Sequence, residues 1–380
     1  METSGATYDC AIIGGGLSGL CLGIQLVSSG RSVILFEKTE YPSHKVCGEY
    51  ISMESHRFLC DLGLPLTDWN LPHITQLGIS SENGFMLNSP LDLGGFGISR
   101  YTLDHELYKL AITKGVNVVQ HCKVHRVASQ SNTLHILETS KGKYTARLLC
   151  GSYGKYTPTF IREQPDFISH TKNTTNFIGV KYHIKTTLAH NRIELHNFKD
   201  GYCGISKVDK DWYCLCYLSH SKNLQMHGND LKKMEEEVLY KNPFLKAYFT
   251  QSEFITTQPL IISNIQFSKK QTQAGSVFLL GDAAGSISPL CGNGMSMGMR
   301  ASKLLATEMI RYFESHHSHK TLELNYRKAW GQAFNTRIKA GYYLQRLFGK
   351  KTMTHLTLKL LDKLPGITKK IISLTHGKPF

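Results

Sequence analysis

The 380-residue chain contains no apolar run that reaches the roughly 18 residues needed for a membrane-spanning helix. Its first residues, METS, carry neither the basic segment nor the cleavage site of a signal peptide. Internal repeats and low-complexity linkers are also absent. These absences predict a globular protein located in the cytoplasm, and the length is typical of two or three lobes.

The ten cysteines include no CxxC pair, and the two that lie nearest in sequence are Cys214 and Cys216. Zinc sites and disulfide frameworks need cysteines at close or regular spacing. We therefore expect free thiols in a reducing compartment and no metal site.

The formal net charge of +15 is concentrated near the end of the chain. Residues 337–380 hold ten Lys or Arg and one acid, Asp362, so this segment alone contributes +9. Nucleic-acid binding would require basic residues interleaved with stacking aromatics, and Tyr342, Tyr343 and Phe348 are too few for that. We expect no nucleic-acid partner.

The amino-terminal segment has the pattern of a dinucleotide-binding fold. Residues 8–13 predict a short buried strand, which runs into the sequence GGGLSG at 14–19 and then into a helix that ends at Ser29. Residues 33–36 predict a second strand, and Glu37 follows it, 21 residues after Gly16. This is the GxGxxG fingerprint in its required strand–turn–helix context.

The chemistry of this pattern favours a bound diphosphate. The glycines permit a tight turn and a close approach of the backbone to a pyrophosphate at the helix N-terminus. Glu37 is placed to accept a hydrogen bond from a ribose 2′-OH. The fingerprint does not distinguish FAD from NAD, and no second copy follows Gly19. One such copy excludes disulfide-reductase-type enzymes, which have separate FAD and NAD domains.

A second glycine-rich segment, residues 281–299 (GDAAGSISPLCGNGMSMGM), follows the apolar residues 277–280. It resembles the second FAD motif of the flavoprotein superfamily that includes aromatic hydroxylases, flavin-dependent halogenases and geranylgeranyl reductases. The resemblance implies that Asp282 holds the ribityl chain and that a helix starting between Gly292 and Met295 points at the pyrimidine edge of the flavin. The free N–H groups of such a helix would stabilise the negative charge of a reduced flavin. Met295, Met297 and Met299 are more typical of core packing.

Two further segments support the resemblance. Residues 98–111 (ISRYTLDHELYKLA) look like the helix entry at which an arginine reaches the cofactor, so Arg100 is expected to contact FAD; the alternative is a surface arginine before a capped helix. Residues 45–52 (KVCGEYIS) are similar to the Cys-Gly-Glu segment of geranylgeranyl reductases, which lies near the flavin ring. Cys47 is then a candidate for the reactive face, and a buried, inert cysteine is the alternative.

The resemblance predicts an α/β (α+β) fold: a Rossmann-type FAD-binding domain of the p-hydroxybenzoate hydroxylase and glutathione reductase kind, an antiparallel-sheet substrate domain and C-terminal helices. We assign the FAD-binding domain to residues 1–70, 96–165 and 260–312. The substrate domain comprises 71–95 and 166–259, and the helical region 313–380.

Periodicity supports the predicted substrate domain. Residues 74–87 predict two strands with a turn at Asn83-Gly84. Apolar residues at 178, 180, 182 and 184 alternate with Lys181, His183 and Lys185, which indicates a half-buried strand. Residues 193–195 and 212–218 continue this pattern, and 229–249 predict one charged helix.

Towards the end of the chain, two apolar stripes at helical spacing lie beside lysines. Leu356, Leu360, Leu361 and Leu364 form the first stripe, and Ile367, Ile371, Ile372 and Leu374 form the second. Two interpretations stay open. The helices could cap the protein's own substrate tunnel, or they could make a peripheral membrane contact, with the cytoplasmic location then including membrane association.

The chain also departs from the superfamily. Hydroxylases and prenyl reductases usually carry an Asp-Gly pair where this chain has Tyr153-Gly154, which puts NAD(P)H use in doubt. Halogenases carry a Trp-x-Trp-x-Ile-Pro stretch, whereas residues 201–206 (GYCGIS) contain no tryptophan, so halogenation is not expected. The same stretch is a poor copy of the lipid motif of prenyl reductases.

The function predicted by the resemblance is that of an FAD-dependent oxidoreductase, a flavoprotein reduced by NAD(P)H or by a partner reductase. The leading reaction is that of a monooxygenase (hydroxylase) on a hydrophobic aromatic or polyketide-like small molecule. The alternatives are a reductase of C=C bonds in an isoprenoid lipid and a non-catalytic FAD-binding partner protein.

The predicted site residues fall into two groups. Those expected to be catalytic are Cys47, Pro289, Gly292 and Asn293. Those expected to bind the cofactor are Gly14, Gly16, Leu17, Ser18, Gly19, Glu37, Lys38, Lys45, Arg100, Gly281, Asp282, Gly292, Gly294 and Met295.

Overall fold

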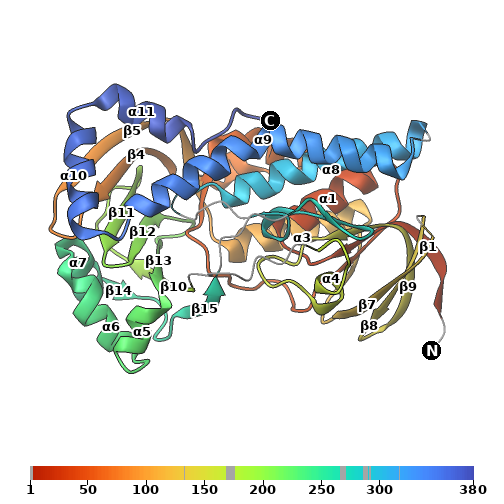
Figure 1. Ribbon diagram of the computed structural model, residues 1–380, viewed down its shortest axis with the longest axis horizontal. Coiled ribbons are helices and arrows are strands. Elements are labelled where there is room, and N and C mark those ends of the chain that lie inside the picture. Colours follow the sequence, from red (N-terminus) through yellow and green to blue (C-terminus); the bar gives the residue numbers. More distant parts are fainter. Residues whose placement is uncertain are drawn as a thin grey trace.

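The computed structural model describes residues 3–131, 133–167, 176–265, 271–285, 290, 292–315 and 317–380. Two β-sheets lie at opposite ends of the molecule, and the long helix α9 (His319–Leu347) extends from one end towards the other (Figure 1). The predicted fold class is confirmed: a Rossmann-type part, a second sheet and C-terminal helices.

The first sheet has eight strands in the described part of the chain and a parallel centre. The parallel strands, in spatial order, are β17 (Val277–Leu279), β9 (Gly142–Gly151), β1 (Thr3–Ile13), β2 (Val33–Phe36) and β6 (Asn117–Val119). Strands β16 (Gln273–Ala274), β7 (Val124–Ser131) and β8 (Leu134–Thr139) join by antiparallel pairing. Strand β2 has the predicted bounds, whereas β1 starts earlier than predicted.

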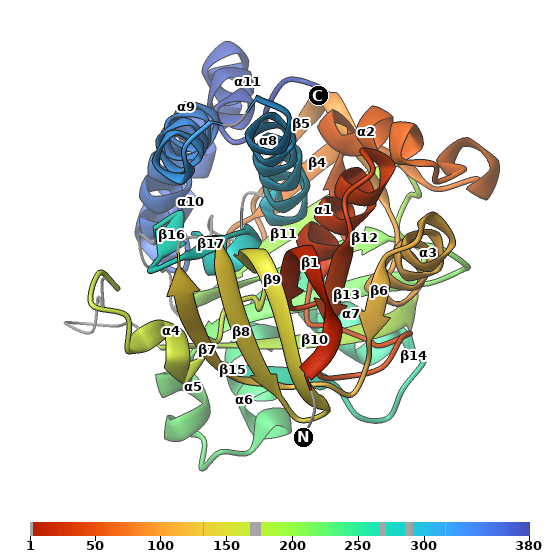
Figure 2. The ribbon, with the colours of Figure 1, turned by 90° about the vertical axis from the view of Figure 1, so that its right-hand side faces the viewer.

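Helices pack beside this sheet because its central strands are apolar on both faces. The bundle consists of α1 (Leu17–Ser28), α3 (Arg100–Lys114), α8 (Gly294–Ser315) and α9 (Figure 2). Helix α1 contacts both α3 and α8. Met297 and Met299 lie buried in this core, as expected.

The fingerprint glycines allow α1 to start directly against the strands. Gly14 has a φ of +106°, and a Cβ there would lie 2.4 Å from the carbonyl oxygen of Ser152. A Cβ on Gly19 would lie 2.3 Å from the carbonyl oxygen of Gly14. Both positions therefore exclude a side chain, since Cβ atoms do not approach other heavy atoms so closely.

The second sheet has nine strands in the described part of the chain. Their order is β14 (Glu253–Phe254), β10 (Phe177–Lys185), β13 (Tyr213–His220), β12 (Gly201–Lys207), β11 (Arg192–Phe198), β4 (His73–Ser80), β5 (Met86–Gly97) and β3 (Tyr50–Ser52), with β15 (Leu260–Ile265) paired to β10. The pairing is antiparallel except between β11 and β4. Gly84, with a φ of +87°, lies in the predicted turn between β4 and β5.

The domain boundaries stay a prediction. Strands β3 and β15 pair within the second sheet, although the ranges predicted for the FAD-binding domain contain them. The short helices α2 (His56–Leu62), α4 (Thr159–Arg162) and α5 (Ser221–Met226) connect the larger elements.

The single helix predicted over 229–249 is wrong. The chain forms α6 (Leu231–Val238), a 3₁₀ turn and α7 (Pro243–Gln251). Pro243 cannot donate a backbone hydrogen bond, so a helix can start but not continue there. The fully buried Asn242 caps α7, and its amide group donates to the Ser81 and Asn197 carbonyls.

The half-buried strand predicted around residue 180 is also wrong, because β10 is buried on both faces apart from its ends. Lys181 is 1% exposed and His183 is 6% exposed. Their polar atoms meet the buried carboxylate of Glu49 rather than water. Alternation of apolar and polar residues does not reveal such a buried partner.

The C-terminal helices α10 (Lys351–Asp362) and α11 (Pro365–Ser373) pack against β5 of the second sheet (Figure 1). The last residues then return to the first half of the molecule. The Arg300 side chain donates to the carbonyl of Lys378, and the Phe380 N–H donates to the carbonyl of Glu54. Among the described residues, no helix combines the length and apolarity needed to cross a membrane.

The contact between α1 and β1 makes a paired prediction. Gly19→Ala should lower the free energy of unfolding by about 1–3 kcal/mol, because the new methyl group overlaps the Gly14 carbonyl. Gly23→Ala is the matched control: its Cβ would lie at an ordinary 3.4 Å from Val116, so better helix propensity should stabilise the protein by up to about 1 kcal/mol. Urea unfolding measures both. Equal effects of the two substitutions would contradict the packing argument.

Candidate active site

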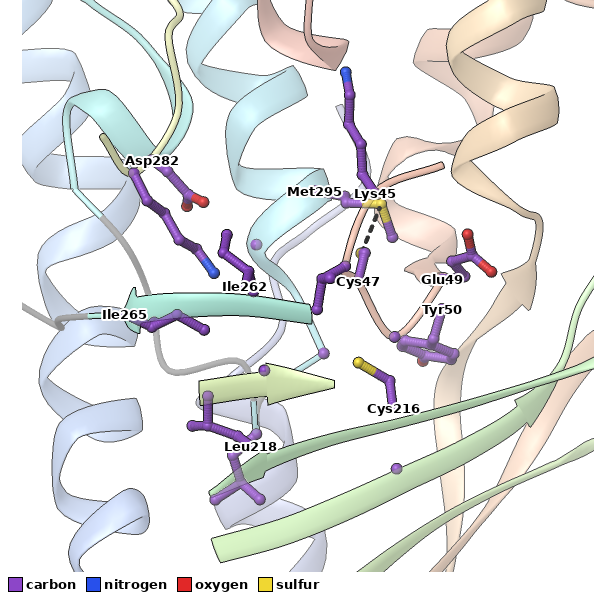
Figure 3. Close-up of a pocket in the computed structure, with 18 of the residues that line it drawn as sticks. Lys45, Cys47, Glu49, Tyr50, Cys216, Leu218, Ile262, Ile265, Asp282 and Met295 are labelled. Carbon is purple, nitrogen blue, oxygen red and sulfur yellow. Dashed lines mark hydrogen bonds between the residues drawn. The ribbon is translucent and has the colours of Figure 1, made fainter. Parts of the chain in front are cut away.

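A cavity of about 1130 Å³ lies between the two sheets and carries the candidate site. One end is lined by the fingerprint loop and the second glycine-rich segment, and the other by the second sheet and the C-terminal helices. Figure 3 shows the middle of the cavity, which is lined by Cys47, Asp282 and Met295 together with residues of β15.

The fingerprint end is shaped for an anion. Gly16 is the N-cap residue of α1. It has no side chain that could accept hydrogen bonds from the first N–H groups of the helix. A Cβ on Gly16 would meet no protein atom within 4 Å, unlike one on Gly14 or Gly19. Gly16 thus borders open space at a helix N-terminus, which suits a diphosphate.

Glu37 follows β2 at the edge of the same space and is 7% exposed. One carboxylate oxygen accepts a hydrogen bond from the Gly15 N–H at 2.8 Å, and the other accepts two from Thr39. Tyr41 also donates its hydroxyl to the Gly15 carbonyl. Because a carboxylate oxygen can accept two hydrogen bonds and the one bound by Gly15 accepts a single bond, Glu37 keeps capacity for a ribose hydroxyl while it holds the loop.

The two glycine-rich segments meet at Ser18. The Ser18 hydroxyl lies 2.8 Å from the position of a Cβ on Gly281 and 2.4 Å from that of one on Gly298. Gly281 adopts a φ of +55°, and Asp282 follows it in a 3₁₀ turn that lines the cavity. Segments more than 260 residues apart therefore form one wall.

The start of α8 forms the next part of that wall. Gly292, with a φ of +62°, Gly294 and Met295 line the cavity. Asn293 lies between them, but its side chain is fully buried and donates to the Thr375 carbonyl at 2.8 Å. Its catalytic role stays a prediction that this contact does not favour. Pro289 lies outside the described residues.

Arg100 begins α3 as predicted, after the capping residue Ser99. It lines the cavity, and its guanidinium forms two hydrogen bonds to Asp104, at 2.7 and 2.8 Å. Lys45 binds the same carboxylate at 2.9 Å. Burial alone would raise the pKa of Asp104, but the two cations outweigh burial and hold this pKa below its usual value. One buried anion therefore places two cations at the cavity.

Cys47 is half-buried and lines the cavity, and its place at the reactive face stays a prediction. Its Sγ lies 3.6 Å from Met295 Sδ (Figure 3). Its carbonyl accepts a hydrogen bond from the Cys214 thiol at 3.2 Å. Burial raises the pKa of Cys214 well above its ordinary value, so that group stays a thiol donor. None of the described cysteines forms a disulfide.

Of the remaining residues predicted to bind the cofactor, all but one line the cavity. Leu17, Ser18, Lys38 and Lys45 line the cavity together with the residues described above. Gly19 does not line it and instead packs under the Gly14 carbonyl. The structure thus brings these residues together, while their individual roles stay predictions.

A buried ionic cluster that we did not predict lies behind Cys47. Glu49 is fully buried, with a left-handed φ of 56°, and one carboxylate oxygen accepts hydrogen bonds from Lys181 Nζ and the Arg100 N–H. The other oxygen lies 2.6 Å from His183 Nε2. Burial raises the pKa of Glu49, but the hydrogen bond from His183 and the charge of Lys181 outweigh burial and set it below its usual value.

This cluster positions the loop that carries Cys47. Lys181 Nζ also donates to the Lys45 carbonyl at 3.1 Å, so β10 holds the loop on both sides of Cys47. The only available signal in the sequence was Glu49 in the Cys-Gly-Glu segment. Nothing local in β10 indicated that a lysine would turn inward.

Three potential metal-binding groups of this cluster, those of Glu49, His183 and Cys214, lie within 4.8 Å of one another. Lys181 is ion-paired with the same Glu49 carboxylate. A cation added there would meet an ammonium group at close range, which opposes metal binding. We therefore infer that Glu49, His183 and Cys214 position the loop and do not bind a metal ion.

The far end of the cavity is apolar. Its lining includes Leu77, Leu87, Leu91, Ile193, Leu195, Leu344, Leu347, Leu358 and Ile372. The inner faces of α10 and α11 contribute Leu358, Leu361, Thr368 and Ile372. Of the two interpretations of the C-terminal helices, the structure shows the capping of the cavity directly.

The charge balance around Glu49 makes a second paired prediction. Lys181→Met should lower the free energy of unfolding by about 3–5 kcal/mol, because it leaves a buried carboxylate without its cation. Lys185→Met is the control on the same strand: its partner Glu253 and its own side chain are exposed, so the cost should stay below about 1 kcal/mol. Denaturant unfolding compares the two. A small effect at Lys181 would show that the cluster does not hold the loop.

Residues 12–65 match the family model of the NAD(P)-binding Rossmann-like domain. The chain is 28% identical to conditioned medium factor receptor 1 of Dictyostelium discoideum, over 89% of this chain and 71% of that protein. It is 29% identical to 1H-pyrrole-2-carbonyl-(peptidyl-carrier protein) brominase of Pseudoalteromonas luteoviolacea, over 47% of this chain and 50% of that protein.

Solved structures with a similar fold include three flavoprotein types. The flavin-dependent brominase Bmp2 superposes with a TM-score of 0.80 and 16% identity over 97% of this chain and 93% of that chain. A geranylgeranyl bacteriochlorophyll reductase-like protein of Thermoplasma acidophilum superposes with a TM-score of 0.77 and 16% identity, over 100% of this chain and 97% of that chain. PqsL of Pseudomonas aeruginosa, described as a probable FAD-dependent monooxygenase, superposes with a TM-score of 0.72 and 14% identity, over 92% of this chain and 98% of that chain. The predicted resemblance to this superfamily is thus confirmed at the level of the fold.

Proposed function

We propose that this protein, whose chain has the fold of flavin-dependent brominases, PqsL and geranylgeranyl reductase-like proteins, is an FAD-dependent oxidoreductase. The observation that carries the proposal is the convergence of the two glycine-rich segments at Ser18, on one cavity, with open space beside Gly16. An NAD-binding lobe alone would not require the second segment.

The residues present fit FAD. The N-terminus of α1 would bind the diphosphate, and Glu37 the adenosine ribose. Arg100 would add positive charge, and Asp282 would hold the ribityl chain. The first N–H groups of α8, after Gly292, would face the pyrimidine edge and stabilise negative charge there. The bound flavin would supply the redox chemistry, and the chain would supply orientation and exclusion of water.

The reaction that we propose first is monooxygenation of a hydrophobic aromatic or polyketide-like small molecule at the apolar end. PqsL, which has this fold, has been solved in complex with 2-aminobenzoylacetate. An aliphatic lining keeps water from the reacting centre, as a monooxygenase requires. The electron donor would be NAD(P)H or a partner reductase. We place the protein in the cytoplasm, since the spacing of its ten cysteines in sequence does not match a disulfide framework.

Specific observations also favour two alternatives. The position of Cys47 at the cavity, with Met295 against its sulfur, and the fold of the geranylgeranyl reductase-like protein favour reduction of C=C bonds in an isoprenoid lipid. The name of the Dictyostelium relative, a receptor, favours a non-catalytic FAD-binding partner protein. Flavin turnover separates these classes.

The open space beside Gly16 tests FAD binding. Gly16→Val should abolish retention of flavin, because the side chain would fill the space assigned to the diphosphate. The measurement is the visible absorbance of the purified protein before and after addition of FAD. Gly366→Val is the control, since a Cβ there also meets no protein atom but lies on α11, away from the fingerprint. A yellow Gly16→Val protein would remove the basis of the proposal.

The reaction class has its own test. With NADPH and air, a monooxygenase should consume oxygen in response to an aromatic substrate and release a hydroxylated product. A reductase should instead consume an isoprenoid alkene under anaerobic conditions. Anaerobic bleaching of the flavin by NADPH alone reports whether a partner reductase is needed. Tight flavin binding without turnover of either kind would support the non-catalytic alternative.

A further inference from the structure

The outer faces of α10 and α11 expose a cluster of large apolar side chains. Six of the fifteen exposed large apolar residues in the described part of the chain lie between residues 353 and 374. They are Met353, Leu356, Leu360, Leu364, Ile367 and Leu374. Leu356 is 61% exposed, Leu360 58% and Ile367 50%. We call these six residues the outer apolar face.

Helix geometry aligns the outer apolar face. Met353, Leu356 and Leu360 follow one another at spacings of three and four residues, which places them on one side of α10. The corresponding pair is Ile367 on α11 and Leu374, the residue that caps the C-terminus of α11, one seven-residue step apart. In a soluble protein, the apolar stripe of a surface helix normally packs against the core. On these two helices a different set of residues faces the cavity, and the outer apolar face stays exposed.

Positive charge surrounds this face. Residues 350–374 contain six lysines and one acid, Asp362. Lys359, Lys363 and Lys370 are exposed on the two helices and the link between them. Their aliphatic stems can lie along an apolar surface while the ammonium groups reach outward. Apolar residues bordered by lysines match an anionic membrane surface. An acidic groove on a protein would account for the lysines but not for the apolar residues.

The inner faces of the same helices line the cavity. Leu358 and Leu361 of α10, and Thr368 and Ile372 of α11, border its apolar end. One layer of two helices is therefore all that separates the apolar end from the outer apolar face. A molecule dissolved in lipid could reach the cavity at this layer without crossing water.

We propose that α10 and α11 dock on an anionic membrane surface through the outer apolar face, and that the cavity receives a membrane-dissolved substrate between them. The docking part stands on the surface residues alone. The substrate part rests on the proposed function, because it takes the cavity to be the substrate site.

The test uses the full-length, flavin-loaded protein and vesicles of phosphatidylcholine with or without phosphatidylserine. The protein should sediment with the anionic vesicles, and added salt should release it. Leu356→Ser with Leu360→Ser should weaken the binding at least about tenfold, because both side chains lose apolar area that enters the lipid. Lys359→Gln with Lys363→Gln should weaken it roughly 25-fold, at about fivefold per lysine.

The control variant removes exposed apolar residues elsewhere. Ile112→Ser with Met226→Ser should bind vesicles like the unchanged protein, since these residues lie on α3 and α5. Slower amide hydrogen exchange in 353–374 on addition of vesicles should locate the contact. Flavin absorbance is recorded for every variant, so that loss of the proposed function is seen separately from loss of docking.

Three results would overturn the docking proposal. The protein would fail to sediment with the anionic vesicles, or all variants would sediment equally, which would place the contact elsewhere. Alternatively, the chain would be a dimer in solution that Leu356→Ser with Leu360→Ser converts to a monomer, without vesicle binding. In that case the outer apolar face is an interface between two copies.

Discussion

The close approach of α1 and α8 at Ser18 is the constraint on which the rest of the structure depends. Gly281 adopts a left-handed φ of +55°, which favours glycine, and a Cβ on Gly298 would lie 2.4 Å from the Ser18 hydroxyl, which would then have to move. Once the two helices meet in this way, their N-termini both border the cavity. Two helix N-termini then lie at one cavity, an arrangement that suits the proposed cofactor, which has a diphosphate and a ring that becomes anionic.

The second half of the molecule is joined to this arrangement by buried charge. Glu49 lies in the loop between the two sheets, whereas Lys181 and His183 come from β10 of the second sheet. A buried ion pair of this kind contributes little net stability compared with apolar packing, but it tolerates only one register of the strand against the loop. The cluster therefore fixes where Cys47 lies relative to Met295, and with it the geometry of the middle of the cavity.

Much of the first half could be predicted from sequence, because its determinants are local. Strand β2, the capped start of α3 and the glycine positions each follow from a short segment. The contacts that were missed are long-range: Lys181 with Glu49, and Asn293 with Thr375, join residues that no periodicity connects. The half that contains the second sheet showed the same limit in part: Pro243 is a local signal for the break, whereas Ser81 and Asn197, which bind Asn242, are distant in sequence.

The contact between Asn293 and Thr375 also gives the C-terminal helices a physical connection to the cavity wall formed by the glycine-rich segments. Thr375 lies two residues after the end of α11, and Asn293 directly precedes α8, whose first turn borders the cavity. A displacement of α11 would strain this hydrogen bond or move the Gly292–Gly294 backbone with it. The Asn293 amide oxygen is buried without a hydrogen-bond partner among the described residues, so among these residues the bond to Thr375 is the side chain's one hydrogen bond. This hydrogen bond therefore connects the end of the helical layer to the N-terminus of α8 across the cavity wall.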